Sequence, residues 1–102
     1  MTLKQIREDL REIRYYYSRK ETFEKAFSII GKTDIEEKID KYNKVICKAT
    51  PKMYDLYASL YIENNTQESL SAELGYTSVH LSRLHCGLVK FFYEAFNKKE
   101  VN

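Results

Sequence analysis

The stretch "LSAELGYTSVHLSRLH", residues 70–85, decides how the fold of this chain is interpreted. Its spacing predicts two short helices set at an angle around Gly75, where the turn needs a left-handed backbone that is favourable only for glycine. Thr66 and Thr77 stand where each helix needs a capping hydroxyl group. We therefore predict a helix-turn-helix whose first helix spans residues 67–74 and whose second spans about 77–90.

The apolar spacing inside this motif supports the same prediction. Leucines and a tyrosine fall where side chains must face a core, and a small serine falls where the two helices touch. These positions are Leu70, Ser71, Leu74, Tyr76, Leu81 and Leu84. Across residues 70–85 the only fixed positive charge is Arg83, against one acid, Glu73. The motif is therefore poor in the basic residues that bind phosphates.

The composition of the whole chain favours an all-α fold. Its 102 residues are 43% hydrophobic and 31% charged, which is the balance of a folded soluble protein rather than a disordered one. With three glycines and one proline, the chain has few of the turn-forming residues that strand-rich folds need. The length suits one domain, or one small core with an appended helix. We divide the chain into an N-terminal helical segment for packing or dimerisation, residues 1–49, and a helix-turn-helix domain, residues 50–102.

The first helix is predicted to begin at a capping box formed by Thr2 and Gln5. Apolar residues then recur at alternating steps of three and four, at Leu3, Ile6, Leu10, Ile13 and Tyr17. A basic flank follows one residue behind this stripe, at Lys4, Arg7, Arg11 and Arg14. We interpret the flank as the solvated edge of an amphipathic helix; the alternatives are contacts with phosphates or a dimer seam.

A second long helix is predicted in the middle of the chain. The helical pattern first extends to Gly31 through three apolar residues, Phe23, Phe27 and Ile30. Thr33 with Glu36 then predicts a new N-terminus. One apolar face follows, at Ile35, Ile39, Tyr42, Ile46 and Ala49. Cys47 adjoins this face, so we predict a packed, inert thiol group.

Two further apolar faces flank the motif. Thr50 as N-cap and Pro51 at the first helical position predict where the next helix begins. Its apolar face is Met53, Leu56, Tyr57, Leu60 and Tyr61. An extended last helix carries the other, at Leu88, Phe91, Phe92, Ala95 and Phe96. We interpret the last face as core that packs on the first or second helix; the alternative is an aromatic surface for a dimer or a polymerase.

The segment "LYIENNTQESLSAELGYTSVHLSRLHCGLVKFF", residues 60–92, resembles region 4 of sigma-70-type factors. It is more similar still to the small sigma-region-4-like regulators of phages and mobile elements in Gram-positive bacteria. The matching words are Leu60-Tyr61-Ile62, Thr66-Gln67-Glu68, Glu73-Leu74-Gly75-Tyr76 and Arg83-Leu84-His85. The resemblance covers about the last half of the chain. Region 2, which melts promoter DNA in a full sigma factor, is not expected here.

The resemblance implies a DNA-binding transcriptional regulator whose second helix, about residues 77–90, enters the major groove of double-stranded DNA. The residues implied to bind DNA are Thr77, Ser78, Val79, Ser82, Arg83, Cys86 and Lys90. Arg83 would bind guanine O6 and N7, a contact typically worth about 1–3 kcal/mol of discrimination. The two serines can donate to phosphates or bases, Val79 can pack on a thymine methyl group, and Thr77 would cap the helix and direct its free amides at a phosphate.

The chain departs from the family's pattern on this helix. Ser78 and Gly87 stand where sigma-type sequences often carry basic residues. Gly87 also weakens the helix by about 1 kcal/mol relative to alanine, and it suggests a kink or a close backbone contact. The basic excess lies elsewhere, since residues 1–50 carry 12 basic and 9 acidic side chains and residues 51–102 carry 5 and 6. Affinity for DNA must therefore come from a homodimer or from Arg7, Arg11, Arg14, Arg19 and Lys20.

A different function, an interaction module that uses the same scaffold to engage RNA polymerase or another regulator, is the alternative. Nine tyrosines and five phenylalanines favour it, because aromatic residues suit protein contact surfaces. We do not expect an enzyme, a cofactor or a metal ion, since the sequence has no glycine-rich phosphate loop, nucleophile arrangement or metal-ligand spacing. No apolar run approaches the ~20 residues of a membrane span, so we expect a cytoplasmic protein with reduced cysteines.

Overall fold

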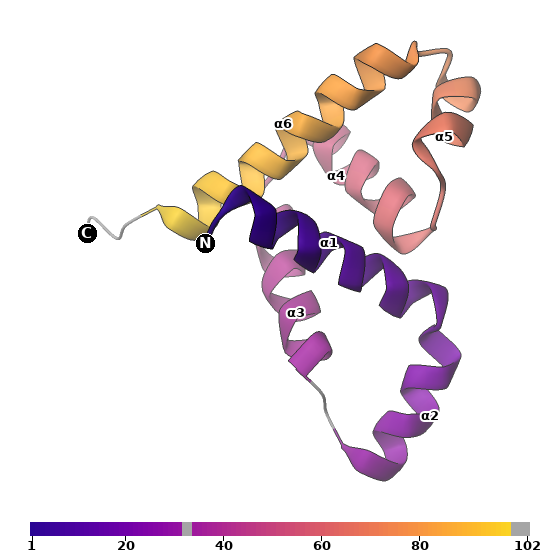
Figure 1. Cartoon of the computed structure of the whole chain (residues 1–102), viewed down its shortest axis with the longest axis vertical. Helices are drawn as coiled ribbons and strands as arrows, with labels where there is room; N and C mark the ends of the chain where they lie inside the picture. The colour runs from indigo at the N-terminus through magenta and orange to yellow at the C-terminus, as the bar shows by residue number, and fades with distance from the viewer. Residues whose placement is uncertain (32–33, 99–102) are drawn as a thin grey trace.

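The computed structural model describes residues 1–31 and 34–98 and is all-helical over that part of the chain (Figure 1). The elements are α1 (Leu3–Ser18), α2 (Lys20–Ile30), α3 (Asp34–Ile46), α4 (Pro51–Tyr57), a π-helical turn η1 (Ala58–Ile62), α5 (Gln67–Leu74) and α6 (Ser78–Asn97). No strand occurs among these residues, which confirms the predicted all-α class. The predicted cap at Thr33 and the side chains of Phe27 and Ile30 lie outside the described part.

Helix α1 begins as predicted and ends at a break that the sequence left open. The backbone N–H of Gln5 donates to Thr2 Oγ1 at 3.1 Å, and the N–H of Thr2 donates to Gln5 Oε1 at 2.7 Å, which completes the capping box. At the other end Arg19 adopts φ −124° and ψ 31°, outside the helical range. The chain therefore bends at Arg19, and α1 and α2 are separate helices.

One hydrophobic core joins both halves of the chain. From α1 it receives Ile6, Leu10 and Ile13, each at most 1% exposed, and Tyr16. The other helices contribute Ile39, Tyr42, Ile46, Leu56, Tyr57, Leu60, Tyr61, Leu70, Leu81, Leu88, Val89 and Phe92. The division predicted at residues 49 and 50 falls in the turn between α3 and α4.

The central residues of the α1 stripe pack inside this chain. Ile6, Leu10 and Ile13 have no exposed surface left for a second copy. Only the first member of the stripe, Leu3, is substantially exposed, at 38%. In this structure the stripe therefore packs within one chain, and the dimer alternative stays a prediction.

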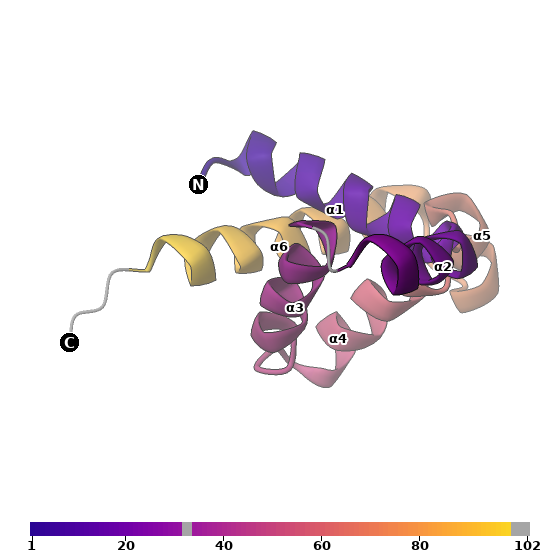
Figure 2. The same ribbon diagram turned by 90° about the horizontal axis from the view of Figure 1, so that it is seen from below.

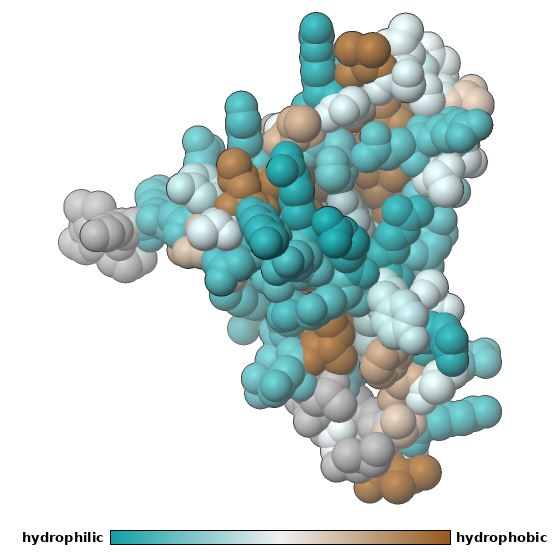
Figure 3. Space-filling view, in the orientation of Figure 1, coloured by the Kyte–Doolittle hydropathy of each residue, from teal (hydrophilic) through white to brown (hydrophobic). Residues whose placement is uncertain are grey.

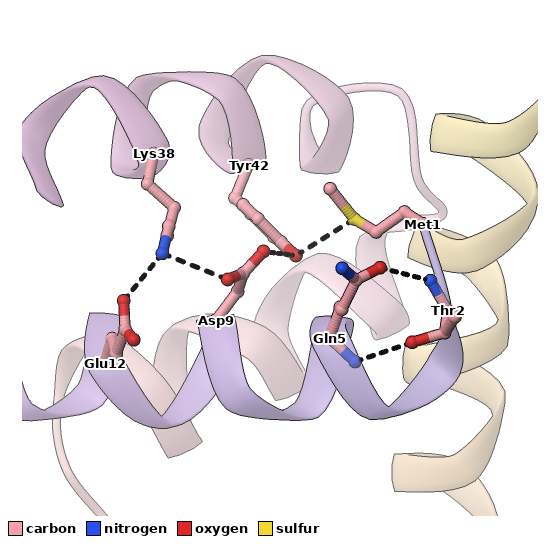
Figure 4. Close-up of polar contacts among 7 residues, drawn as sticks. All are labelled: Met1, Thr2, Gln5, Asp9, Glu12, Lys38 and Tyr42. Carbon is pink, nitrogen blue, oxygen red and sulfur yellow. Dashed lines mark hydrogen bonds and ion pairs between the residues drawn. The ribbon is translucent and has the colours of Figure 1, made fainter. Parts of the chain in front are cut away.

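Polar contacts fix one side of α1 against α3 (Figure 4). Lys38 Nζ lies 3.1 Å from Asp9 Oδ1 and 2.6 Å from Glu12 Oε1. The Tyr42 hydroxyl donates to Asp9 Oδ2 at 2.7 Å. Burial, together with the neighbouring carboxylate of Asp9, raises the pKa of Tyr42 far above its usual value. The acidic side of α1 therefore faces α3.

The N-terminus of the described chain is fastened to the end of α6. The Met1 amino group donates to Asn97 Oδ1 at 2.8 Å, and Asn97 Nδ2 donates to the Met1 carbonyl oxygen at 2.7 Å. From this junction α1 and α6 diverge, with α4 behind them in the view of Figure 1. Helix α3 lies below the two, as the turned view in Figure 2 shows. Helices α1 and α6 thus pack on the same core.

The turn between α5 and α6 has the predicted backbone. Thr66 Oγ1 accepts the N–H of Ser69 at 2.9 Å and Thr77 Oγ1 accepts the N–H of His80 at 3.0 Å, so both caps are confirmed. Gly75 is left-handed, with φ 73° and ψ 17°. Across the turn the Ser71 hydroxyl donates to the carbonyl oxygen of Tyr76.

Three predictions about single residues are wrong. Leu74 is 46% exposed, because it borders a hollow of about 100 Å³ beneath the turn rather than filling the core. Cys47 is exposed, because α3 ends at Ile46 and the chain turns away. Gly87 makes no close contact, since a Cβ atom there would meet nothing within 4 Å, and α6 runs through it without a break.

Candidate nucleic-acid interface

The outer face of α6 gathers all seven residues that the resemblance implied for DNA binding. Leu81 and Leu88 point to the core with no exposed surface. On the other side of the helix and at its cap, the exposed residues are Thr77, Ser78, Val79, Ser82, Arg83, Cys86 and Lys90. Val79 is 61% exposed among the polar residues of this face. We call these seven residues the α6 face.

The first turn of α6 is held in place by its surroundings. The Thr77 cap and the left-handed Gly75 set where the helix begins and in which direction it leaves the turn. The ring of Tyr76 lies edge-on to the ring of His80 at 4.7 Å between centroids. Lys52 Nζ lies 5.9 Å from the Tyr76 ring centroid. Because the first N–H groups of a helix lack partners within it, this fixed end can accept a phosphate oxygen.

The charge on the α6 face is small. It carries two cations, Arg83 and Lys90, and the neighbouring helix α5 adds exposed acids, Glu68 and Glu73. A protein that binds DNA through many phosphates needs more positive charge than this. DNA binding by the α6 face would therefore need positive charge from another element of the fold.

Helix α1 supplies positive charge on the side that faces away from α3. Asp9 and Glu12 pair with Lys38, whereas Arg7 and Arg11 are exposed elsewhere on the helix. Arg14 is half-buried, and its Nη2 donates to the carbonyl oxygen of Asn65 at 3.0 Å. Figure 3 shows hydrophilic side chains gathered over α1 in the middle of the molecule. Arg14 therefore serves as a tie to the segment before α5, and Arg7 and Arg11 remain available to a ligand.

The basic side of α1 lies next to the middle of α6. His85 of α6 hydrogen-bonds through Nε2 to the hydroxyl of Tyr61, and the two rings stack at 5.9 Å between centroids. Burial lowers the pKa of His85, and the positive charges of Arg7 and Arg14 lower it further. Burial raises the pKa of Tyr61 to about 12, against the opposing effect of the same arginines. These effects place the α1 arginines within electrostatic reach of α6.

The His85–Tyr61 pair is a feature that the sequence did not predict. Both residues fall at helical spacing among apolar neighbours, and nothing in a single sequence indicates that they meet.

Arg19 and Lys20, the other candidate phosphate contacts, are exposed at the corner between α1 and α2. The candidate phosphate contacts therefore lie on α1 and at the start of α2, apart in sequence from the α6 face.

Other kinds of site receive no support from the described residues. Within residues 1–31 and 34–98, no group of three or more His, Cys, Asp or Glu side chains is placed to hold a metal ion. Cys47 and Cys86 are both free thiols. In the same part of the chain, no helix combines the length and apolar character needed to cross a bilayer. Comparisons with protein-family models, with curated proteins and with solved structures give no match.

Proposed function

We propose that this chain is a sequence-specific, double-stranded-DNA-binding transcriptional regulator of the sigma-region-4-like kind, with α6 as its reading helix. The observation that carries the proposal is the α6 face, which is exposed from Thr77 to Lys90 and begins directly after the left-handed turn at Gly75. Leu81 and Leu88 anchor the same helix in the core. Major-groove recognition requires a helix that is anchored in the core on one side and exposes its reading surface on the other.

Arg83 is the residue assigned to sequence recognition. It is exposed on the second turn of α6, where a guanidinium group can donate to guanine O6 and N7 together. The exposed methyl groups of Val79 suit contact with a thymine methyl group, and the hydroxyl groups of Ser78 and Ser82 suit hydrogen bonds to bases or phosphates.

Arg7 and Arg11 of α1 are assigned to phosphate contacts. They are exposed, whereas Arg14 is engaged with Asn65. Contacts with phosphates add affinity for any duplex without adding sequence preference. Substitution of Arg7 or Arg11 by alanine should therefore make the slope of log K against log salt concentration shallower by about 0.9 per lost contact. The preferred sequence should stay unchanged.

The proposal includes two copies on two half-sites, because one α6 face offers few charges. Any contact between the copies must use a surface other than the α1 stripe, whose central residues are buried. A two-fold symmetric binding sequence would support this arrangement.

The experiment is selection from a random duplex pool by the purified protein, with Arg83→Ala and Lys25→Ala in parallel. Lys25 is exposed on α2 and serves as a matched loss of one charge. We expect an enriched motif with the unaltered protein and with Lys25→Ala, and a loss of preference at one or two positions with Arg83→Ala. Unchanged selection by Arg83→Ala would remove this residue from the mechanism.

The second candidate function is an interaction module that engages RNA polymerase or another regulator. The exposed Val79 and the small charge of the α6 face favour it. An additional selection with polymerase present separates the two: enrichment only in that arm indicates a polymerase-dependent helper. Binding that barely weakens from low to moderate salt indicates protein contacts rather than phosphates.

A further inference from the structure

A groove of about 700 Å³ lies between the second half of α3 and the last third of α6. Val45 of α3 and Phe91 and Ala95 of α6 form its apolar floor. Figure 2 shows the end of α6 projecting past α3.

The groove exists because two neighbouring phenylalanines take different roles. Phe92 is completely buried, with its ring centroid 4.8 Å from that of Tyr42 and 5.6 Å from that of Tyr57. Phe91 is only half-buried and lies at the rim of the core. One turn later the small, exposed Ala95 leaves the space beside it empty. Apolar surface is therefore left open beside a well-packed core.

The rim of this groove is basic. Lys48 and Lys98 line it, against the single acid Glu94. Outside the lining, the second half of α3 carries Lys41, whose Nζ lies 4.7 Å from the Phe96 ring centroid, together with Lys44 and one acid, Asp40. An apolar floor inside a lysine rim favours a ligand that presents apolar side chains together with carboxylates.

We propose that the groove between α3 and α6 binds an acidic amphipathic helix of a partner protein. Such a helix would place apolar residues, spaced by three or four positions, on Val45, Phe91 and Ala95 and direct its carboxylates at Lys48 and Lys98. Nucleic acid fits less well, since its phosphates would meet the lysines but leave the apolar floor uncovered. The groove uses residues 91–98 of α6, whereas the α6 face ends at Lys90. The inference therefore does not depend on DNA binding.

The test is selection from a displayed library of 16-residue helical peptides. Leucines are fixed at every third or fourth position, and the remaining positions are randomised. The targets are the unaltered protein and the Lys48→Glu/Lys98→Glu double variant, whose substitutions are both at the surface. We expect acidic sequences on the unaltered protein and a shift to basic sequences on the double variant. Failure to enrich any peptide, or enrichment that ignores the charge reversal, would overturn the proposal.

The best peptide is then synthesised and its affinity measured by fluorescence anisotropy. We expect Lys48→Glu to weaken binding by about tenfold and Lys25→Glu, the matched change on α2, to leave it unaltered. Ala95→Glu tests the floor and should also weaken binding, while circular dichroism shows that each variant stays helical. Equal effects of Lys48→Glu and Lys25→Glu would contradict the proposal. So would a short DNA duplex that binds in a Lys48-dependent manner while no peptide does.

Discussion

At the scale of single residues, substitution of two glycines by alanine should change the free energy of unfolding in opposite directions. Gly75 has a left-handed backbone, so Gly75→Ala should lower the free energy of unfolding by about 1 kcal/mol. Gly87 lies in a helix with open space around its missing Cβ, so Gly87→Ala should raise that free energy by about 0.5–1 kcal/mol. Urea unfolding of the two variants measures both. A gain in stability for Gly75→Ala would contradict the left-handed backbone at residue 75.

His85 predicts how stability depends on pH. Its pKa is lowered in the folded protein, so below about pH 6.5 the unfolded chain takes up the proton first. Stability due to this residue is therefore complete above pH 6.5 and falls as the pH drops toward the folded pKa. We expect the urea concentration at the unfolding midpoint to decrease as the pH is lowered from 7.5 to 5.5. The decrease should be smaller in His85→Phe. His80→Gln, a change at an exposed histidine, should behave like the unaltered protein.

At the scale of helices, Thr77 separates helix capping from recognition. Thr77→Ala removes the bond to the N–H of His80 and should cost about 1 kcal/mol of stability. Thr77→Asp keeps a capping oxygen and should retain most of that stability, but its negative charge would repel a phosphate. Under the proposed function we expect Thr77→Asp to stay folded and to bind DNA more weakly than Thr77→Ala. Thermal unfolding and duplex titration of both variants provide the comparison.

The helices that the sequence predicted best are those with strong local signals. The caps at Thr2, Thr50, Thr66 and Thr77 appear where expected, because each hydroxyl group bonds to a backbone N–H three residues away. The break at Arg19 carries no glycine or proline, and the exposure of Leu74 and Cys47 depends on which distant helix packs nearby. The meeting of α1 arginines with α6 likewise depends on the tertiary fold, which a single sequence does not display.

At the scale of the whole molecule, the shared core makes residues 50–102 dependent on the rest. Leu60, Leu88 and Phe92 pack in one cluster with Ile6 and Ile13 of α1. A fragment of residues 50–102 would expose these side chains, and we expect it to lack cooperative thermal unfolding by circular dichroism. A fragment that unfolds cooperatively would show that the C-terminal half is an independent domain.

Helix α6 also fixes where the two proposed binding surfaces lie relative to each other. Its 20 residues span about 30 Å as one uninterrupted helix, with the α6 face over its first turns and the proposed groove at its last. Inserting one residue near Gly87 would turn the last part of α6 by about 100° and take Leu88 and Phe92 out of the core. The angle between the two proposed surfaces is therefore fixed by the packing of α6 as well as by the number of residues between them.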